Sequence, residues 1–483
     1  MPVSSRYRPA PRFLELGEGF SDAVPPARFP MHQLRFRNQR WAERVGLGDL
    51  DDAEWERHFA RFEPLPENVP EPLALRYHGH QFRTYNPDLG DGRGFLFAQL
   101  LDGEDRLLDL ATKGGGQTPW SRSGDGRLTL KGGVREVLAT EMLEALGVYT
   151  SKSFSLFETG ESLTRGDEPS PTRSSVLVRL GHSHMRFGSF QRHLALGDRD
   201  RVARLLEHCV RHYAPSRDGG AEDTPRAFLA LVAERSARLC ASWMAAGFVH
   251  GVLNSDNMNV TGESFDYGPW RFLPTYDLDF TAAYFDQTGL YSFGRQPDAV
   301  LWNLTRFAEA LSVLTQVEGL VEVLRGFGPR FLADYAERVL HRFGLVPRGD
   351  ERDADFLSHF RAFASESGVG HDQLFFDWYG GMASAPRAAS SPEAAKYEGA
   401  AFLALRRALD DYEPAAPARL DDSYFQRPQP CTMLIDEVEA IWDPIATRDD
   451  WSAFEQKVAD IRAMGRALAN EFRPARARSD SQD

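Results

Sequence analysis

The sequence predicts an α+β fold in which a strand-rich part is followed by a helix-rich part. Between residues 76 and 190, turn-forming residues separate short apolar runs, a pattern typical of β-strands. From about residue 198 onward, apolar residues recur at the three- and four-residue spacing of amphipathic helices. The chain has 483 residues, of which 42% are hydrophobic, so it is long enough for two to three domain-sized units.

Changes in composition divide the chain into four predicted parts. The first part is rich in Pro, Arg and Phe with weak periodicity, and it is expected to be mainly an extended arm packed on the core. The parts are an N-terminal arm at 1–75, a strand-rich lobe at 76–190, a helical lobe at 191–426, and a helical extension with a polar tail at 427–483.

The strand-rich lobe is predicted to contain one prominent helix. Apolar residues of this helix share one face, and Gly147 follows its last apolar residue, as expected of a helix end. The predicted elements are a short helix near 37–45, strands at 95–101, 107–112, 153–158 and 175–180, and the prominent helix at 134–146.

The second half of the chain is predicted to be mostly helical. Gly247 is well placed to end one of these helices, because glycine tolerates the left-handed conformation that follows many helix C-termini. The predicted elements are helices at 198–213, 227–246, 297–311, 331–343 and 451–472, with loops at 383–392 and 414–417.

Composition disfavours several classes of function. The net charge of −14 argues against a general binder of nucleic acids or membrane surfaces, because either needs a basic face. Cys209, Cys240 and Cys431 show no CxxC spacing, so neither a zinc site nor a disulfide framework is predicted from them. Neither a membrane-spanning run nor a signal-peptide pattern is found, and the cytoplasm is the expected location.

The stretch from His250 to Pro269 carries polar residues between two apolar segments. It holds Asn254, Asp256, Asn257 and Asp266, and it is predicted to be a strand–loop–strand hairpin. Mg²⁺ prefers oxygen ligands and commonly takes one or two carboxylates together with substrate phosphates. The alternative is that these residues only form turns, in which Asn, Asp and Gly are common.

Lys113 and Glu136 form a second candidate group. Lys113 ends a predicted strand before three glycines, and Glu136 lies on the prominent predicted helix. Protein kinases use such a lysine–glutamate pair to hold nucleotide phosphates. The alternative is an ordinary ion pair on the surface. However, a lysine that ends a strand, then a glutamate on a helix, then a hairpin with metal-ligand residues is a more specific order than the lysine–glutamate pair alone.

The hairpin departs from the kinase pattern at one position. The His-Gly pair that starts at His250 is followed by Val252, where small-molecule and atypical kinases carry Asp. Asn257 stands at the expected position, and Asp266 begins a DYG tripeptide where a kinase has Asp-Phe-Gly. The metal ligands are therefore kept, whereas the usual base is missing. Asp256 is the obvious spare carboxylate for a base.

Arginine and glycine clusters gather within the strand-rich lobe. Arg93 lies in LGDGRG, Arg179 and Arg186 lie in VLVRLGHSHMRFG, and residues 125–127 form a further Asp-Gly-Arg group. Guanidinium groups bind phosphates bidentately. For any single arginine a solvated surface position is the better interpretation, but several such clusters in one lobe favour a polyphosphate site.

Six ordered motifs together resemble a known family. The motifs LGDGRG, KGGGQTPWSRSGDGR, VREVLATE, HGVLNSDNMNV, DYGP and YSFGRQP span about Tyr77 to Pro297. They closely resemble the selenoprotein O (SelO, YdiU-like) family of protein adenylyltransferases. The resemblance implies a bilobal protein-kinase-like fold with N- and C-terminal extensions. It also implies that ATP binds in the orientation opposite to that in kinases, so that its α-phosphate faces the acceptor. It also implies transfer of AMP to Ser, Thr or Tyr hydroxyls of proteins with release of pyrophosphate.

The same resemblance implies roles for individual residues. Asp256 would be the proton acceptor, Asn257 and Asp266 would bind Mg²⁺, with Mn²⁺ as the alternative, and Glu136 would orient Lys113. The implied partners are ATP and proteins with hydroxyl side chains, and neither nucleic acid nor membrane is implied. The implied ATP contacts are Gly90, Gly92, Arg93, Lys113, Asp125, Gly126, Arg179, Arg186 and Asp266.

The chain also departs from the family. Some members carry selenocysteine or cysteine near the C-terminus, whereas this chain ends in RARARSDSQD, and FTAAYFD after Asp279 has no cysteine either. Thiol-based regulation is therefore not expected, and the sequence from about residue 427 differs from the usual family ending. Three alternatives stay open at this point: a true kinase, a nucleotide-binding pseudokinase scaffold, and an enzyme that transfers UMP with Mn²⁺.

Overall fold

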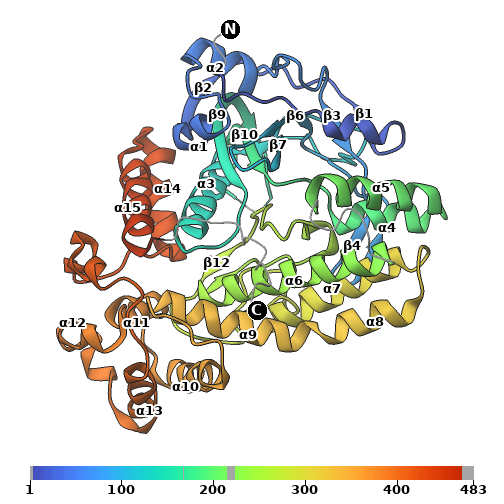
Figure 1. The fold of residues 1–483 in the computed structure, drawn as a ribbon. Coiled ribbons are helices and arrows are strands. Elements are labelled where there is room, and N and C mark those ends of the chain that lie inside the picture. Colours follow the sequence, from blue (N-terminus) through green and yellow to red (C-terminus); the bar gives the residue numbers. More distant parts are fainter. Residues whose placement is uncertain (1–3, 167, 215–222, 470–483) are drawn as a thin grey trace.

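The computed structural model describes residues 4–166, 168–214 and 223–469. It has a mixed α+β fold, as the sequence predicted. A strand-rich layer lies at the top of Figure 1, and a group of long helices lies beneath it. Among the described residues, no helix combines the length and the apolar character needed to cross a bilayer.

The central feature of the upper layer is an eight-stranded antiparallel sheet. Its main path runs β1-β3-β6-β7-β10-β9-β2, and β8 pairs with β10. The four predicted strands correspond to β6, β7, β9 and β10, and they form the middle of this sheet. The strands are β1 Ser21–Ala23, β2 Gln33–Arg37, β3 Leu73–Leu75, β6 Leu96–Leu101, β7 Leu107–Lys113, β8 Leu128–Thr129, β9 Lys152–Leu163 and β10 Thr172–Gly181.

The prominent predicted helix is α3, Leu130–Ala145, which begins four residues earlier than expected. Its first turn contains Gly132 and Gly133, which the apolar pattern did not mark as helical. The Thr129 side chain accepts a hydrogen bond from the Gly132 amide and so caps the helix. A Cβ at Gly133 would approach Leu156 Cδ1 to 2.5 Å, so close packing on the sheet explains that glycine.

The N-terminal segment is more ordered than the expected extended arm. It supplies β1, β2 and β3 to the sheet, and it forms η1 Arg12–Leu16, α1 Gln39–Arg44 and α2 Asp52–Phe59. Trp41, Trp55 and Phe59 are buried in a core that also contains residues of β6, β7, β9 and β10. Residues 1–75 therefore help to build the sheet layer, whereas their weak sequence periodicity predicted only a covering arm.

The helical layer contains four of the five predicted helices and several more, and the fifth lies against α3. Gly247 follows α6 with φ of 65°, as predicted for a residue that ends a helix. The helices of this layer are α4 Phe187–Ala195, α5 Arg199–Tyr213, α6 Thr224–Ala245, α7 Gln296–Leu311, α8 Val317–Arg325, α9 Phe327–Arg342, α10 Glu351–Ser367, α11 His371–Asp377 and α13 Gly399–Asp410.

The C-terminal part corrects one loop prediction. The segment 383–392 was predicted to be a loop, but η5 Gly381–Ser384 and α12 Ala385–Ala389 occupy most of it, with a proline in the first helical turn where it is tolerated. The predicted loop at 414–417 ends where η7 Pro417–Asp421 begins.

Two further helices, α14 Ile435–Arg448 and α15 Ser452–Leu468, flank α3 (Figure 1). The predicted C-terminal helix at 451–472 corresponds to α15, and its expected last residues lie outside the described chain. Ion pairs fasten both helices to α3, with Lys131 bound to Glu439 and Arg462 bound to Glu141.

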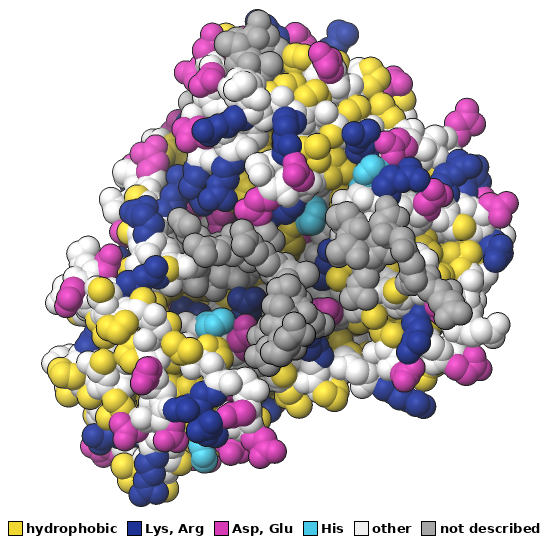
Figure 2. Space-filling model, viewed as in Figure 1, with side chains coloured by type: hydrophobic (Ala, Val, Ile, Leu, Met, Phe, Trp, Pro, Cys, Tyr) yellow, Lys and Arg dark blue, Asp and Glu magenta, His cyan; other side chains and the backbone are white. Residues whose placement is uncertain are grey.

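Charges of both signs are mixed on the surface, and the three cysteines are buried. Acidic and basic side chains are interspersed over the described part of the face drawn in Figure 2. Cys209, Cys240 and Cys431 are buried and are not joined in disulfides. All three belong to the main hydrophobic core.

Candidate active site

The predicted polar hairpin is present in the structure. β11 Phe248–Val249 pairs with β12 Arg271–Phe272, and the long loop between them contains η3 Ser255–Asn257. Asn254 has a structural role, because its side-chain oxygen accepts hydrogen bonds from the Phe82 amide at 3.1 Å and the Tyr291 hydroxyl at 2.8 Å. For Asn254 the turn interpretation is therefore correct.

Lys113 and Glu136 form a buried ion pair, as predicted. Lys113 ends β7 and Glu136 lies on the buried face of α3. Their side chains are only 5% and 1% exposed, and Lys113 Nζ contacts Glu136 Oε1. Burial of both groups excludes the alternative of a solvated surface pair. The same Nζ lies 2.9 Å from Asp266 Oδ1, so the lysine joins the strand, the helix and the hairpin.

Asp266 is the point where the cations meet. Arg179 Nη1 donates to Asp266 Oδ1 at 3.2 Å, from β10 next to β7. Burial by itself would raise the pKa of this carboxyl, but Lys113, Arg179 and Arg186 outweigh burial and hold the pKa well below its usual range. Asp266 is therefore ionised at neutral pH. Its φ of 65° is uncommon for a non-glycine residue, and such conformations cluster at functional sites.

Arg186 is a buried cation that connects the hairpin to the first glycine-rich loop. Its Nη1 donates to the Asp256 backbone carbonyl at 2.8 Å, and its Nη2 lies 3.4 Å from Asp91 Oδ1. The guanidinium also lies 4.5 Å from the centre of the Tyr77 ring and 4.8 Å from that of Phe265. Arg186 is thus fixed in position by an acid, a carbonyl and two aromatic rings.

Asp256 has the properties of a proton acceptor. It is 7% exposed, and its Oδ1 has no hydrogen-bond partner within the described part of the chain. Burial raises the pKa of its carboxyl to about 6, although the Arg186 charge opposes this shift. A carboxylate with a raised pKa and an unused oxygen is suited to accept a proton near neutral pH.

Asn257 is oriented by its own loop. Its side-chain amide nitrogen donates to the Val252 carbonyl at 3.0 Å. The side-chain oxygen is the other polar atom of this amide. Together with the Asp266 carboxylate, it offers the oxygen donors that Mg²⁺ prefers.

The two glycine-rich loops lie against each other. Thr118 Oγ1 donates to the Asp91 carbonyl at 2.6 Å. A Cβ at Gly90 would stand 2.4 Å from Trp120 Cγ, and one at Gly92 would stand 2.8 Å from the Trp120 carbonyl oxygen. These glycines therefore permit close packing of the first loop on Trp120.

Three other predicted residues make their described contacts outside the group around Lys113. Arg93 is exposed, although its charge is among those that lower the pKa of Asp266. The Asp125 carboxylate pairs with Arg165 at 2.8 Å. Gly126 has φ of 71° and packs on the backbone of Gly116. The structure thus brings Lys113, Glu136, Arg179, Arg186, Asp256 and Asp266 together, and the described contacts of Asp125 and Gly126 lie elsewhere.

Sequence reasoning missed two residues of this site. Asp91 pairs with Arg186, and Gly79 lets the β4–β5 hairpin (Gly79–Gln81 and Thr84–Asn86) approach the catalytic candidate, since a Cβ there would lie 3.0 Å from Asp256 Oδ1. Asp91 stands inside the LGDGRG motif, so the motif itself was a usable signal. The residues that surround Gly79 in the sequence do not indicate that it lies at the site.

Replacing Gly90 by alanine is expected to disturb nucleotide binding. The added methyl group would collide with Trp120, and overpacking of this kind costs roughly 1–3 kcal/mol. We expect weaker ATP binding, measured by titration calorimetry. Gly103→Ala is the matched control, because a Cβ at Gly103 meets no atom within 4 Å. Equal ATP affinity in both variants would contradict a role for this loop contact.

An α+β fold with a buried group of cations beside carboxylate and amide oxygens is typical of an enzyme that handles phosphate groups. The model of one family, described as "Protein adenylyltransferase SelO", matches residues 4–462 of this chain. The chain therefore belongs to the SelO family, as its motifs predicted, and it is a nucleotidyltransferase enzyme.

Relatives from several bacteria carry the name "Protein nucleotidyltransferase YdiU". The Synechocystis protein is 42% identical over 477 residues, which cover 95% of this chain and 98% of the relative. The Synechococcus elongatus protein is 41% identical, with 93% of each chain covered. A Pseudomonas putida protein is 38% identical, with 76% of this chain and 74% of the relative covered.

Proposed function

We propose that this protein transfers AMP from ATP to Ser, Thr or Tyr hydroxyls of other proteins and releases pyrophosphate. The observation that carries the proposal is the buried group in which Lys113 and Arg179 both contact Asp266. The family description supports the adenylyl group, and the names of the relatives support a protein acceptor. A bilobal, kinase-like arrangement and a cytoplasmic location are parts of the same proposal.

The cations of the site are proposed to bind the triphosphate. Lys113, Arg179 and Arg186 are buried, and each is already oriented by a carboxylate. Preorganised positive groups in a site shielded from water stabilise developing negative charge strongly. Glu136 holds the lysine in position, and Arg93 can reach the outer part of the nucleotide from the exposed loop. Gly90, Gly92, Asp125 and Gly126 remain proposed ATP contacts, as the family resemblance implies.

The donor set of the hairpin fits Mg²⁺. Asp266 offers a carboxylate that stays ionised, and Asn257 offers an amide oxygen. These two residues would hold the ion together with phosphate oxygens. When bound, Mg²⁺ would neutralise charge on the transferred phosphoryl group and its leaving group. Mn²⁺ could bind to the same oxygen donors.

Asp256 is proposed to be the general base. Its free Oδ1 accepts the proton of the acceptor hydroxyl as the hydroxyl oxygen forms a bond to the α-phosphorus. The bond between the α-phosphorus and the oxygen bridging to the β-phosphate breaks, and the electron pair leaves with pyrophosphate. ATP bound end for end relative to kinases would present the α-phosphate to the acceptor. Kinases carry their base at the position of Val252. Because Asp256 would act as the base here, this valine would not prevent catalysis.

Incubation with differently labelled ATP separates this proposal from a kinase. We expect label on protein from ATP labelled at the α-phosphate and none from ATP labelled at the γ-phosphate. Intact-mass analysis of the labelled protein should show the mass of an AMP group. Label from the γ position alone would establish a kinase. ATP binding without labelling in either Mg²⁺ or Mn²⁺ would establish a scaffold.

Transfer of UMP is a second candidate that one observation favours. The relatives are named nucleotidyltransferases without a stated base, so their name fits UTP as well as ATP. Parallel reactions with ATP and UTP, each with Mg²⁺ and with Mn²⁺, compare the two donors directly. We expect a higher ratio of kcat to KM for ATP with Mg²⁺, and a higher value for UTP with Mn²⁺ would replace the adenylyl group in our proposal.

A further inference from the structure

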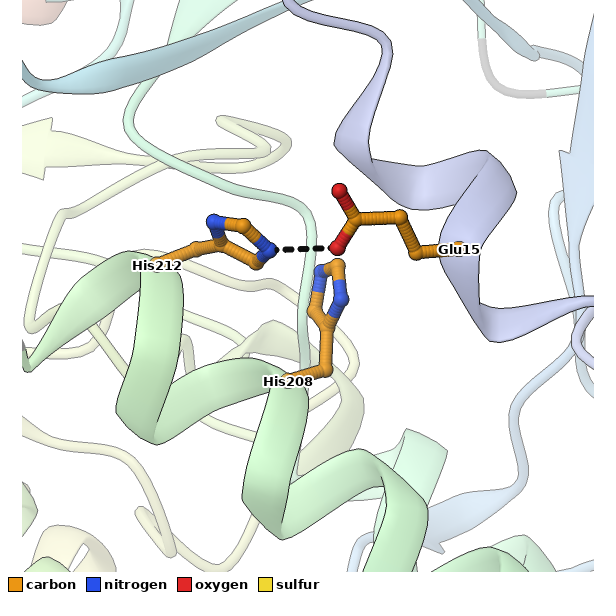
Figure 3. Close-up of side chains that lie close together, drawn as sticks. All are labelled: Glu15, His208 and His212. Carbon is orange, nitrogen blue, oxygen red and sulfur yellow. Dashed lines mark hydrogen bonds and ion pairs between the residues drawn. The ribbon is translucent and has the colours of Figure 1, made fainter. Parts of the chain in front are cut away.

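A second cluster of chemically active side chains lies outside the candidate active site. It consists of Glu15 from η1 and of His208 and His212 from α5 (Figure 3). The two histidines are four positions apart, so they share one face of the helix. One potential ligand atom from each residue lies within 4.8 Å of the others. Figure 3 shows the three side chains converging on one point between the two elements.

Two members of the cluster are already in contact. His212 Nε2 lies 2.8 Å from Glu15 Oε2, as in an ordinary hydrogen bond or ion pair. That simple interpretation accounts for these two residues. It leaves the third residue, His208, unexplained.

His208 is buried and has an unused ring nitrogen. The residue is 4% exposed, and its Nε2 has no hydrogen-bond partner within the described chain. Buried polar atoms without partners are rare and call for an explanation. In Figure 3 the His208 ring extends toward the Glu15 carboxylate and the His212 ring.

The carboxylate is held by neighbouring cations. Arg12 Nη1 lies 3.3 Å from Glu15 Oε1, on the oxygen that does not contact His212. Arg211 Nη1 lies 3.9 Å from Oε2, but its Nη2 is also bound to Glu207 at 2.6 Å. Arg12 can therefore orient the carboxylate in the way that outer partners orient metal ligands. The nearby positive charges of Arg12 and Arg211 oppose a bound cation.

We propose that Glu15, His208 and His212 bind a divalent transition-metal ion of the Zn²⁺ type. Two imidazoles and one carboxylate are a common ligand set for Zn²⁺, with water in the fourth position. Mg²⁺ prefers oxygen ligands and is not expected here. The bound ion would replace the proton between His212 and Glu15, and it would give His208 Nε2 a partner.

The proposed ion would fasten the N-terminal segment to the helical layer. Glu15 and His212 are 197 positions apart in the chain, and η1 already packs on α5. A ligand that binds the folded state alone raises its stability. The proposal does not depend on the proposed transfer of AMP, because none of the three residues belongs to the candidate active site.

Zinc binding by the full-length, tag-free protein tests the proposal. After treatment with a chelator, the protein is dialysed against Zn²⁺ in excess Mg²⁺, which occupies oxygen-rich sites. We expect about one Zn²⁺ per chain in wild type and binding at least roughly tenfold weaker in His212→Ala and Glu15→Gln. Zn²⁺ should also raise the melting temperature of wild type and not that of either variant. Co²⁺ should give visible absorption in wild type alone.

Controls separate loss of Zn²⁺ binding from loss of folding in these variants. Replacing buried His208 also removes packing, so the test depends on the more accessible His212 and Glu15, with circular dichroism to check folding. His359→Ala removes an exposed histidine of α10 and should bind Zn²⁺ like wild type. Equal Zn²⁺ uptake by wild type and by the His212→Ala, Glu15→Gln double variant would overturn the proposal. Absence of Zn²⁺ uptake by wild type would do the same.

Discussion

Replacing Lys113 by alanine is expected to slow nucleotidyl transfer on the order of a hundredfold or more, because a preorganised charge in a shielded site is lost. Lys113 is buried and contacts both Glu136 and Asp266, so no neighbouring water can substitute for it at low cost. The measurement is the initial rate of AMP incorporation from ATP labelled at the α-phosphate. A rate equal to that of wild type would contradict the role of this lysine in binding phosphates.

Loss of folding has to be separated from loss of chemistry in this variant. Removing one partner of a buried ion pair costs about 3–5 kcal/mol, because Glu136 would keep its charge without a cation. A variant with Lys113→Met and Glu136→Leu removes both charges, so it should recover much of the melting temperature but not the rate. Lys131→Ala is the control for loss of one lysine charge, since Lys131 pairs with Glu439 on α14. Its rate should match that of wild type.

The centre of the sheet could be predicted because its strands carry local signals. Strands β6 and β7 are apolar runs on either side of a clear turn, and both are almost fully buried. The first three strands carry no such signal. β1 has only three residues, and it is defined by pairing with β3, as in Ser21 opposite Leu75. Pairing between segments so far apart in sequence is invisible to a local pattern, so the N-terminal segment was expected to be an arm.

The same distinction between local and distant signals applies to the site. Lys113, Glu136 and Asp266 stand in motifs whose order along the chain is informative, and the structure brings them into contact. The pairing of Asp91 with Arg186 joins positions 95 apart, so the LGDGRG motif could mark Asp91 as a site residue but could not identify its partner. The family resemblance implied that Asp125 contacts ATP, and this stays a prediction, since the structure shows only the pairing of its carboxylate with Arg165.

The cluster of Glu15, His208 and His212 shows this limit most clearly. The four-residue spacing of His208 and His212 is visible in the sequence. By itself that spacing fits the polar edge of a helix equally well. Only the fold brings Glu15 to the pair and leaves His208 Nε2 without a partner in the part of the chain that the structure describes.

Replacing Asp256 by asparagine is expected to lower the rate of transfer by roughly 10²–10⁴-fold, the usual contribution of a general base. Asparagine keeps the shape of the side chain and the backbone carbonyl that binds Arg186, but it cannot accept the proton. The tight approach of Gly79 to this side chain also favours a replacement of equal size. We therefore expect ATP affinity close to that of wild type together with a much lower rate, measured by calorimetry and by AMP incorporation.

The combination of retained binding and lost rate is what separates a base from a residue that only holds the nucleotide. If Asp256→Asn lost ATP affinity in proportion to rate, the carboxylate would act in binding, and the base would have to be sought elsewhere. If the variant labelled protein as fast as wild type, Asp256 would have no part in proton transfer. Asp355→Asn, at an exposed position of α10, controls for the general effect of removing one negative charge. Because Asp256 Oδ1 is buried and has no partner among the described residues, its position is costly to maintain unless the acceptor hydroxyl uses it, and this variant measures that use directly.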